Sequence, residues 1–316
     1  MEDRRPSANG VAAAADRIAG LVIQTPLLPL DRDGRRYWIK AECLQRGGSF
    51  KLRGATNRLE QLDADERGRG VVAFSSGNHA RGVALAAQRL GIRAAIVMPA
   101  DAPRVKIDAT RAAGAEIILY DRATGSREEI GARLARERGA VLVPSFDDVD
   151  IIEGQGTVGV EIKEQRGAPP PMVVVPCGGG GLSAGIALAL PESDIVVVEP
   201  AGWDDMTRSL ALGRIVPVEE PAPPSRCDAL QTKLVSPLTF GALRAAGGRG
   251  MSVSEDEVAA AVAFAFSALR IVAEPGGSVA LAALLSGRLD APEGTVVVVS
   301  GGNVDPALYA EIVAAG

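Results

Sequence analysis

Short runs of branched apolar residues alternate with alanine-rich stretches along most of the chain. The runs GVVAFSS, IRAAIVMP and AEIILY are separated by the stretches ARGVALAAQRLG and RVKIDATRAAG. The alternation returns in PMVVVP, GLSAGIALAL and DIVVVEP, and a last apolar run, GTVVVVSGG, lies near the end. Strands buried on both faces read as continuous apolar runs, and the helices between them cover the sheet. The pattern therefore predicts an α/β protein built from βαβ units, with two parallel or mixed sheets.

Composition and charge exclude several classes of protein. The chain has 316 residues, of which 47% are hydrophobic, enough for one large core or two linked ones. Its 34 basic and 39 acidic residues are spread along the sequence with a net charge of −5, so there is no basic stripe for nucleic acid. No apolar run reaches membrane-spanning length, and the N-terminus lacks the apolar segment of a signal peptide. We expect a cytoplasmic protein without nucleic-acid or membrane partners.

Cysteine and histidine usage bears on disulfides and metals. The three cysteines, Cys43, Cys177 and Cys227, are odd in number and widely spaced, and His79 is the only histidine. This pattern is typical of reduced thiols, and it argues against a disulfide framework and a zinc site. An oxygen-ligand site for a hard cation stays open.

Four consecutive glycines, Gly178–Gly181, lie between the run MVVVP and a helix predicted to begin near Leu182. A glycine turn between strand and helix directs free N–H groups and the positive helix end at one spot, which suits a phosphate. Gly179, Gly181 and Ala184 also match G-x-G-x-x-A, with Glu199 twenty residues past Gly179. A dinucleotide-binding unit, and with it a nucleotide-dependent oxidoreductase, therefore stays open at this point.

Three other segments place small polar residues beside glycine at the ends of predicted elements. They are GGSFKLRGA with Lys51, FSSGNHARG with Ser75–His79, and VVVVSGGN with Ser300. The N–H groups of Ser75–His79 could hold a second anion, such as a carboxylate, although a plain helix cap has the same composition. Since α/β sheets bind ligands at the carboxyl ends of their strands, we expect these junctions to meet at one site.

Five motifs in this order, SFKLRGA, SSGNHA, CGGGGLSAG, EPAGWDD and SGGN, extend over nearly the whole chain. Together they resemble the fold-type II pyridoxal-phosphate (PLP) enzymes, and within them the serine/threonine dehydratase and serine racemase group. The resemblance implies the tryptophan synthase β-like fold, with two domains that each have a mostly parallel sheet flanked by helices. It implies a large PLP-binding domain from residues 1–69 and 147–316, a small mobile domain from residues 70–146, and a homodimer.

The resemblance also implies a set of cofactor-binding residues. Lys51 would form a Schiff base with PLP and carry the α-proton, and Phe50 would pack near the ring. Residues Gly178, Gly179, Gly180 and Gly181, with the N–H of Leu182, would bind the phosphate. Asn78 would bond the ring oxygen O3′, Ser300 would face the pyridine nitrogen, and Glu274 would lie near the ring. For Glu274, ordinary capping at a Pro-Gly helix start is the alternative interpretation.

By the same resemblance, the substrate carboxylate would be held by the segment Ser75, Ser76, Gly77, Asn78 and His79. The implied reaction is β-elimination, which converts serine, threonine or 3-hydroxyaspartate to a 2-oxo acid and ammonia. Ser76 stands where serine racemases have a second proton carrier, so racemisation is open, and the alternative is that Ser76 only donates to the carboxylate. A relative that binds the cofactor without catalysis is a further alternative.

Two positions depart from the group's pattern. Arg81 replaces the usual glutamine, which suggests that it binds a second carboxylate, as in 3-hydroxyaspartate, although a solvent-facing helix residue is the plainer interpretation. In EPAGWDD, the resemblance implies a divalent cation (Mg²⁺, Mn²⁺ or Ca²⁺) held by Glu199, Asp205 and the carbonyl of Trp203. Trp203 stands where a small residue is usual, and a capped helix start with ordinary acids is the alternative.

Overall fold

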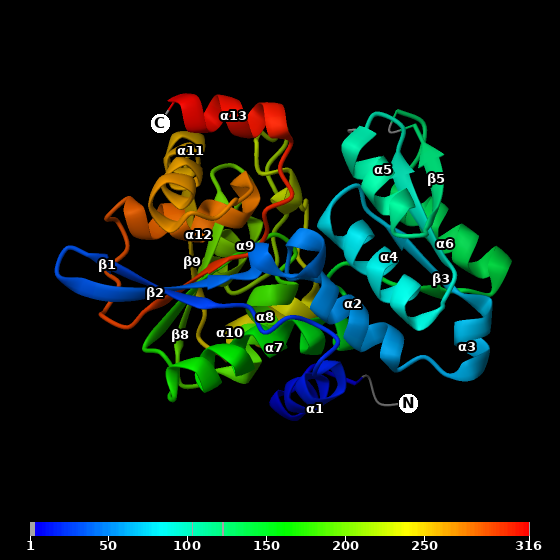
Figure 1. The fold of residues 1–316 in the computed structure, drawn as a ribbon, viewed down its shortest axis with the longest axis horizontal. Coiled ribbons are helices and arrows are strands. Elements are labelled where there is room, and N and C mark those ends of the chain that lie inside the picture. The colour runs from blue at the N-terminus through cyan, green and yellow to red at the C-terminus, as the bar shows by residue number, and fades with distance from the viewer. Residues whose placement is uncertain (1–3, 103, 122, 316) are drawn as a thin grey trace.

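The computed structural model describes residues 4–102, 104–121 and 123–315, which fold around two sheets (Figure 1). A six-stranded sheet has the order β1-β2-β10-β7-β8-β9, and a four-stranded sheet has the order β5-β4-β3-β6. In Figure 1 the smaller sheet and its helices, drawn in cyan and teal, lie to the right of the larger unit. The α/β fold with two sheets that the apolar runs predict is therefore confirmed.

The four-stranded sheet is parallel throughout and uses one continuous part of the chain. Its strands are β3 (Val71–Phe74), β4 (Ala94–Pro99), β5 (Glu116–Tyr120) and β6 (Val141–Leu142). The helices that accompany it are α3 (Ala64–Arg69), α4 (Asn78–Leu90), α5 (Arg104–Ala112) and α6 (Arg127–Arg138). Each crossover is long enough for the helix that a parallel pair requires.

The six-stranded sheet is mixed. Strands β1 (Leu27–Arg32) and β2 (Arg35–Ala41) form an antiparallel hairpin, and the other neighbours are parallel. The hairpin turns at Asp33 and Gly34, whose φ angles of 52° and 74° suit a two-residue turn with positive φ. The remaining strands are β7 (Met172–Pro176), β8 (Asp194–Pro200), β9 (Arg249–Val253) and β10 (Val296–Val299).

Nine further helices belong to this half of the described chain. They are α1 (Ala8–Ile18), α2 (Lys51–Glu60), α7 (Val149–Arg166), α8 (Gly181–Ala189), α9 (Asp205–Leu212), α10 (Pro237–Ala245), α11 (Glu255–Phe264), α12 (Pro275–Leu285) and α13 (Pro306–Ala315). Short helical turns occur at η1 (Glu42–Leu44), η2 (Arg46–Gly48), η3 (Asp228–Leu230) and η4 (Ala265–Leu269). None of the helices in the described ranges is both long and apolar enough to cross a membrane.

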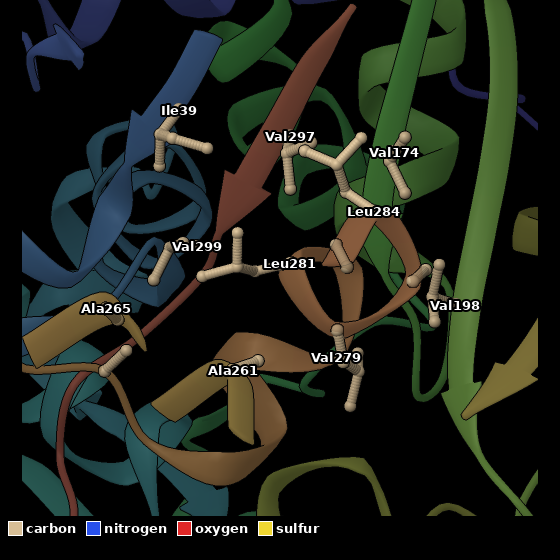
Figure 2. Packing of buried hydrophobic residues seen from close by; sticks show 14 of the residues in the cluster. Ile39, Val174, Val198, Ala261, Ala265, Val279, Leu281, Leu284, Val297 and Val299 are labelled. Carbon is tan, nitrogen blue, oxygen red and sulfur yellow. The ribbon is translucent and has the colours of Figure 1, made fainter. Parts of the chain in front are cut away.

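Alternate residues of the central strands enter different cores. Val297 and Val299 of β10 pack with Leu281 of α12, as Figure 2 shows, whereas Val296 and Val298 belong to the cluster of α7, α8 and α10. Because both faces of the strand are covered, its sequence is a continuous valine run without polar alternation. The helices cover the two faces of the large sheet but not the carboxyl ends of its strands, where α/β proteins bind ligands.

Helix α2 contacts both halves of the molecule. Its Leu52, Ala55 and Leu59 belong to the same hydrophobic cluster as Ile96 of the four-stranded sheet, while α7 packs beside it. The four-stranded sheet lies within residues 70–146, but a helix outside that range covers part of it. The proposed division into domains therefore stays a prediction.

Candidate active site

A cavity of about 1420 Å³ lies where loops of the two sheets meet. It is lined by the start of α2 and by the segments that follow β3, β7 and β10. Most of the residues singled out in the sequence line it: Phe50, Lys51, Ser75, Ser76, Gly77, Asn78, His79, Arg81, Gly178, Gly179, Gly180, Gly181, Leu182, Trp203, Glu274 and Ser300. Glu199 and Asp205 lie outside this lining. The strand-end junctions of the sequence thus converge on one site.

Lys51 is the first residue of α2, and its side chain is enclosed. Its Nζ donates a hydrogen bond to the carbonyl of Ser145 at 2.8 Å and lies 5.1 Å from the centre of the Phe50 ring. Burial lowers the pKa of Lys51 to about 8. Since the neutral amine is the nucleophilic and basic form, this environment makes it available near neutral pH.

A buried ionic network fixes the helix that carries Lys51. Arg53, with no exposed surface, donates to both carboxylate oxygens of Glu42 at 2.8 Å and to those of Glu161 at 2.6 and 2.9 Å. Lys40, also fully buried, pairs with Glu161 at 2.5 Å. Burial opposes the charge of Glu42, but the neighbouring Arg53 outweighs it and lowers the pKa of that carboxyl. The network joins β2, η1, α2 and α7.

Two of the four consecutive glycines, Gly179 and Gly180, stand at positions that leave no room for a side chain. Gly180 has a φ of 86° and precedes α8, so it adopts a left-handed conformation that favours glycine. A Cβ atom on Gly179 would come within 2.3 Å of the Phe146 ring, and one on Gly180 within 2.7 Å of Met206. No acceptor for the N–H groups of residues 178–182 is found in the part of the chain that the structure describes. The loop is a bare, unsatisfied donor cradle at a helix N-terminus, as an anion site requires.

A chain of side-chain hydrogen bonds crosses the cavity wall. Asn78 donates from Nδ2 to Glu274 at 2.5 Å and accepts at Oδ1 from Asn303 at 2.7 Å. Arg81 in turn donates to Oδ1 of Asn303 at 2.7 Å. Burial raises the pKa of Glu274 to about 7, although the bond from Asn78 opposes this shift. The motif SGGN contains Asn303 but assigned it no role, because its partners come from α4 and from the turn before Lys51.

Helix α4 opens toward the cavity without a side-chain cap. It begins at Asn78 after the N-cap Gly77, and the hydroxyl of Ser75 accepts from the Gly77 N–H at 3.1 Å. His79 donates from Nε2 to the Val143 carbonyl at 2.9 Å. Burial, followed by the charge of Lys51, lowers the pKa of His79 to about 3, so its ring is neutral. An uncapped helix start of this kind can bind a carboxylate.

Glu199 and Asp205, two of the three acids of EPAGWDD, lie near each other. Glu199 accepts from the N–H groups of Met206 and Thr207 at 3.1 and 2.7 Å, and from the Thr207 hydroxyl at 2.6 Å. Both oxygens of Asp205 are buried without a hydrogen-bond partner in the described chain. Burial raises the pKa of Glu199 to about 8 and that of Asp205 to about 7. Within the described ranges, no group of three His, Cys, Asp or Glu side chains is placed to hold a metal ion.

A family model described as pyridoxal-phosphate dependent enzyme matches residues 18–302. An L-threo-3-hydroxyaspartate ammonia-lyase from a Pseudomonas species is 42% identical, over 97% of this chain and 98% of the relative. An enzyme of the same name from Saccharomyces cerevisiae is 39% identical, over 98% and 96%. A structure of maize serine racemase superimposes with a TM-score of 0.91 at 34% identity, over 98% and 97%.

These likenesses extend over nearly the full length of each chain, and the matched family model includes Lys51, the glycine loop and Ser300. They agree with the buried amine and the bare anion cradle in one cavity. Glu199, the acid that a dinucleotide site would need, instead bonds the start of α9 and lies outside the cavity lining. The chain belongs to the family of pyridoxal-phosphate dependent enzymes.

Proposed function

We propose that this enzyme is an ammonia-lyase that removes the β-hydroxyl and amino groups of a β-hydroxy amino acid, leaving a 2-oxo acid and ammonia. The observation that carries the proposal is the buried Lys51 amine in the same cavity as the glycine cradle. The names of the relatives from Pseudomonas and yeast support the same reaction class.

The residues present fit pyridoxal phosphate. The N–H groups of residues 178–182 lack acceptors in the described structure, and the first four of these residues carry no side chain that could cover them. In the proposed assignment this loop holds the phosphate, Lys51 holds the aldehyde carbon, and Asn78 and Ser300 contact the ring. Phe50 and Glu274 would lie beside the ring. When bound, the cofactor withdraws electrons from the α-carbon of the substrate.

The chain's own residues supply binding and proton transfer. Within the segment Ser75–His79, the N–H of Ser75 donates to the Val97 carbonyl and that of Gly77 to the Ser75 hydroxyl. The remaining N–H groups of the segment, at the positive end of α4, would bind the substrate carboxylate and so orient the Cα–H bond. Lys51, with a pKa of about 8, takes the α-proton at Nζ because a fraction of its amine is neutral near pH 7. Closure of the small domain over the cavity would exclude water during these steps.

The test of the lyase proposal uses the purified enzyme with cofactor. We expect a visible absorption band from the bound cofactor that borohydride abolishes, and release of 2-oxo acid from serine, threonine or 3-hydroxyaspartate. A protein that binds the cofactor but releases no 2-oxo acid from any of them would be a binding protein without this activity.

Racemisation is the second candidate function. It is favoured by the likeness to maize serine racemase and by Ser76, which lines the cavity. In this proposal the Ser76 hydroxyl delivers a proton to the α-carbon from the face opposite Lys51. Chiral chromatography of serine incubated with wild type and with Ser76→Ala measures it: the variant should lose racemisation while keeping most of the elimination. Equal racemisation by both would leave Ser76 as a carboxylate ligand.

We propose 3-hydroxyaspartate as the preferred substrate class. Arg81 lines the cavity, and in the described chain no carboxylate forms an ion pair with it. Its guanidinium can therefore bind the second carboxylate that serine and threonine lack. We expect Arg81→Gln to lower kcat/KM for 3-hydroxyaspartate at least about ten-fold relative to serine, the equivalent of one charged hydrogen bond. Both diastereomers and phenylserine complete the panel, and an unchanged preference would contradict the proposal.

A divalent cation site is proposed at Glu199, Asp205 and the carbonyl of Trp203. The unpartnered, buried oxygens of Asp205 fit an oxygen-binding ion such as Mg²⁺, Mn²⁺ or Ca²⁺. Glu199 already accepts three hydrogen bonds, which leaves it fewer free lone pairs. Each ion should raise the melting temperature of wild type but not of Asp205→Asn, and a chelator should reverse the effect. Equal responses of the two proteins would argue against the site.

The proposed assembly rests on the family alone, and the proposed location rests on the sequence. We propose a homodimer whose residues 70–146 move as the small domain, and a cytoplasmic location remains a prediction from the sequence. Light scattering of the purified protein measures the mass of the assembly, and a monomer at micromolar concentration would contradict the dimer.

A further inference from the structure

Asn303 joins the loop that follows β10 to the turn before Lys51 and to the start of helix α4. Its Nδ2 donates to Oδ1 of Asn78 and to the carbonyl of Gly47, each at 2.7 Å. Its Oδ1 accepts from Arg81 at 2.7 Å. Both donors and the acceptor of one amide are thus used on partners from the loop before Lys51 and from helix α4.

The partners allow only one orientation of this amide. Arg81 can donate but not accept, and the Gly47 carbonyl can accept but not donate. Both therefore direct Oδ1 of Asn303 toward Arg81 and Nδ2 toward Gly47 and Asn78. Asn78 must then offer its own Oδ1 to Asn303, which turns its Nδ2 toward Glu274 and the cavity.

We infer that Asn303 is a positioning residue that fixes the amide of Asn78 so that its N–H donor faces the cofactor ring. The inference rests on the proposed contact between Asn78 and the ring oxygen. Without this neighbour, the Asn78 amide could rotate and offer its oxygen to Glu274, whose carboxyl holds a proton below about pH 7. The ring oxygen would then face an acceptor instead of a donor.

The backbone around Gly48 is shaped to admit Asn303. Gly48 has a φ of 75°, and a Cβ atom there would come within 2.4 Å of Oδ1 of Asn303. The N–H of Gly302 also donates to the Gly48 carbonyl at 2.9 Å. This hydrogen bond therefore fixes the turn that precedes Lys51 relative to the loop that follows β10. Asn303 connects both segments to α4.

The experiment compares Asn303→Asp with wild type. The new carboxylate keeps its bond with Arg81 but cannot donate to Asn78 or Gly47, so the Asn78 amide turns. We expect the absorption band of the bound cofactor to shift, and the cofactor affinity of the apoprotein to fall about ten-fold, as for one lost hydrogen bond. We expect kcat to fall more than KM rises, because the substrate carboxylate is bound elsewhere.

Asn57→Asp is the matched control. Asn57 likewise accepts from an arginine, Arg17, at 2.5 Å and donates to a backbone carbonyl, that of Asp150, at 2.6 Å. It is buried but does not line the cavity. This variant should lose stability as a buried amide does, yet keep the wild-type absorption band and a cofactor affinity within two-fold.

Asn303→Ala provides a second variant that buries no charge. The same shift and loss of affinity are expected, since Asn78 loses the donor that orients it. Either variant, folded and with the wild-type band and affinity, would overturn the inference. A wild-type protein that shows no cofactor band would instead contradict the proposed function, so the two failures are distinct.

Discussion

Lys51 and Arg53 lie two positions apart on α2, yet their surroundings differ in kind. Arg53 is enclosed by carboxylates and donates to Glu42 and Glu161 with nearly all of its guanidinium. Lys51 is partly buried, its described partner is one carbonyl, and its pKa is lowered to about 8. Arg53 is neutralised by its neighbours, whereas the described partner of Lys51 is uncharged.

This difference in surroundings gives two residues of the same helical turn different roles, one in stability and one in reactivity. A buried charge that is fully paired contributes to a unique arrangement, and breaking the pair leaves its partners uncompensated. A buried amine without a counter-charge costs stability and gains reactivity. We therefore expect substitutions in the Arg53 network to alter folding, and substitutions at the cavity to alter activity.

The largest effect is expected at the unpaired amine. Lys51→Ala removes the nucleophile and the base together, so turnover should fall by about 10⁴-fold or more. The apoprotein should be at least as stable as wild type to unfolding near neutral pH, because the substitution removes an ammonium that burial destabilises. Steady-state assays and urea unfolding measure the two quantities. A large loss of stability in Lys51→Ala would contradict the proposal that Lys51, unlike Arg53, has no structural role.

The next effect is expected at the paired cation. Arg53→Met leaves Glu42 and Glu161 buried without their main partner, so the free energy of unfolding should fall by about 3–5 kcal/mol. Chemical denaturation measures this change, and turnover per folded molecule should stay within about ten-fold. Arg138→Ala serves as control, because its ion pair with Glu116 is about half exposed and should contribute less than about 1 kcal/mol.

A smaller effect, dependent on pH, is expected at Glu274. Its folded pKa is about 7 against an ordinary 4.5, so between these values the folded protein binds more protons than the unfolded chain. Stability from this group is present below about pH 4.5 and is lost as the pH rises through 7. The lost stability amounts to about 3 kcal/mol.

Comparison of the wild-type apoprotein with Glu274→Gln isolates this group, since Glu199 and Asp205 titrate in both. The variant should gain stability over wild type as the pH rises from 4.5 to 7, relative to their difference at pH 4. Unfolding curves at four or five pH values measure this difference. Parallel profiles would place the carboxyl of Glu274 in an ordinary solvated setting.

The sequence predicted the strands well where both faces are buried. The valine runs of β7, β8 and β10 are strands as expected, and α8 begins at Gly181, one residue from the predicted start. The hairpin of β1 and β2 was not predicted, because LLPLDRDGRRYWIKA mixes charged and apolar residues without a long apolar run. Its Asp33-Gly34 turn was the available signal.

Sequence motifs predicted which residues form the site, but they did not predict which of these residues contact one another. Lys51, Ser75–His79 and Gly178–Gly181 could be named because each stands in a recognisable segment and all line one cavity. Arg53 and Asn303 belong to the same motifs, but their roles depend on partners up to 256 positions away in sequence. Such pairings follow from the packing of α2, α4 and α7, which a linear pattern does not contain.

Phe146 gives the glycine loop a dependence on a distant segment. Its ring occupies the space that a side chain on Gly179 would take, and its backbone borders Gly181. The glycine loop therefore packs against the segment between β6 and α7, and its shape depends on that segment. A design that transfers CGGGGLSAG to another α/β scaffold should therefore also place an aromatic residue against the second glycine, as Phe146 is placed here. A side chain at the Gly179 position would in turn have to displace the Phe146 ring or the loop itself.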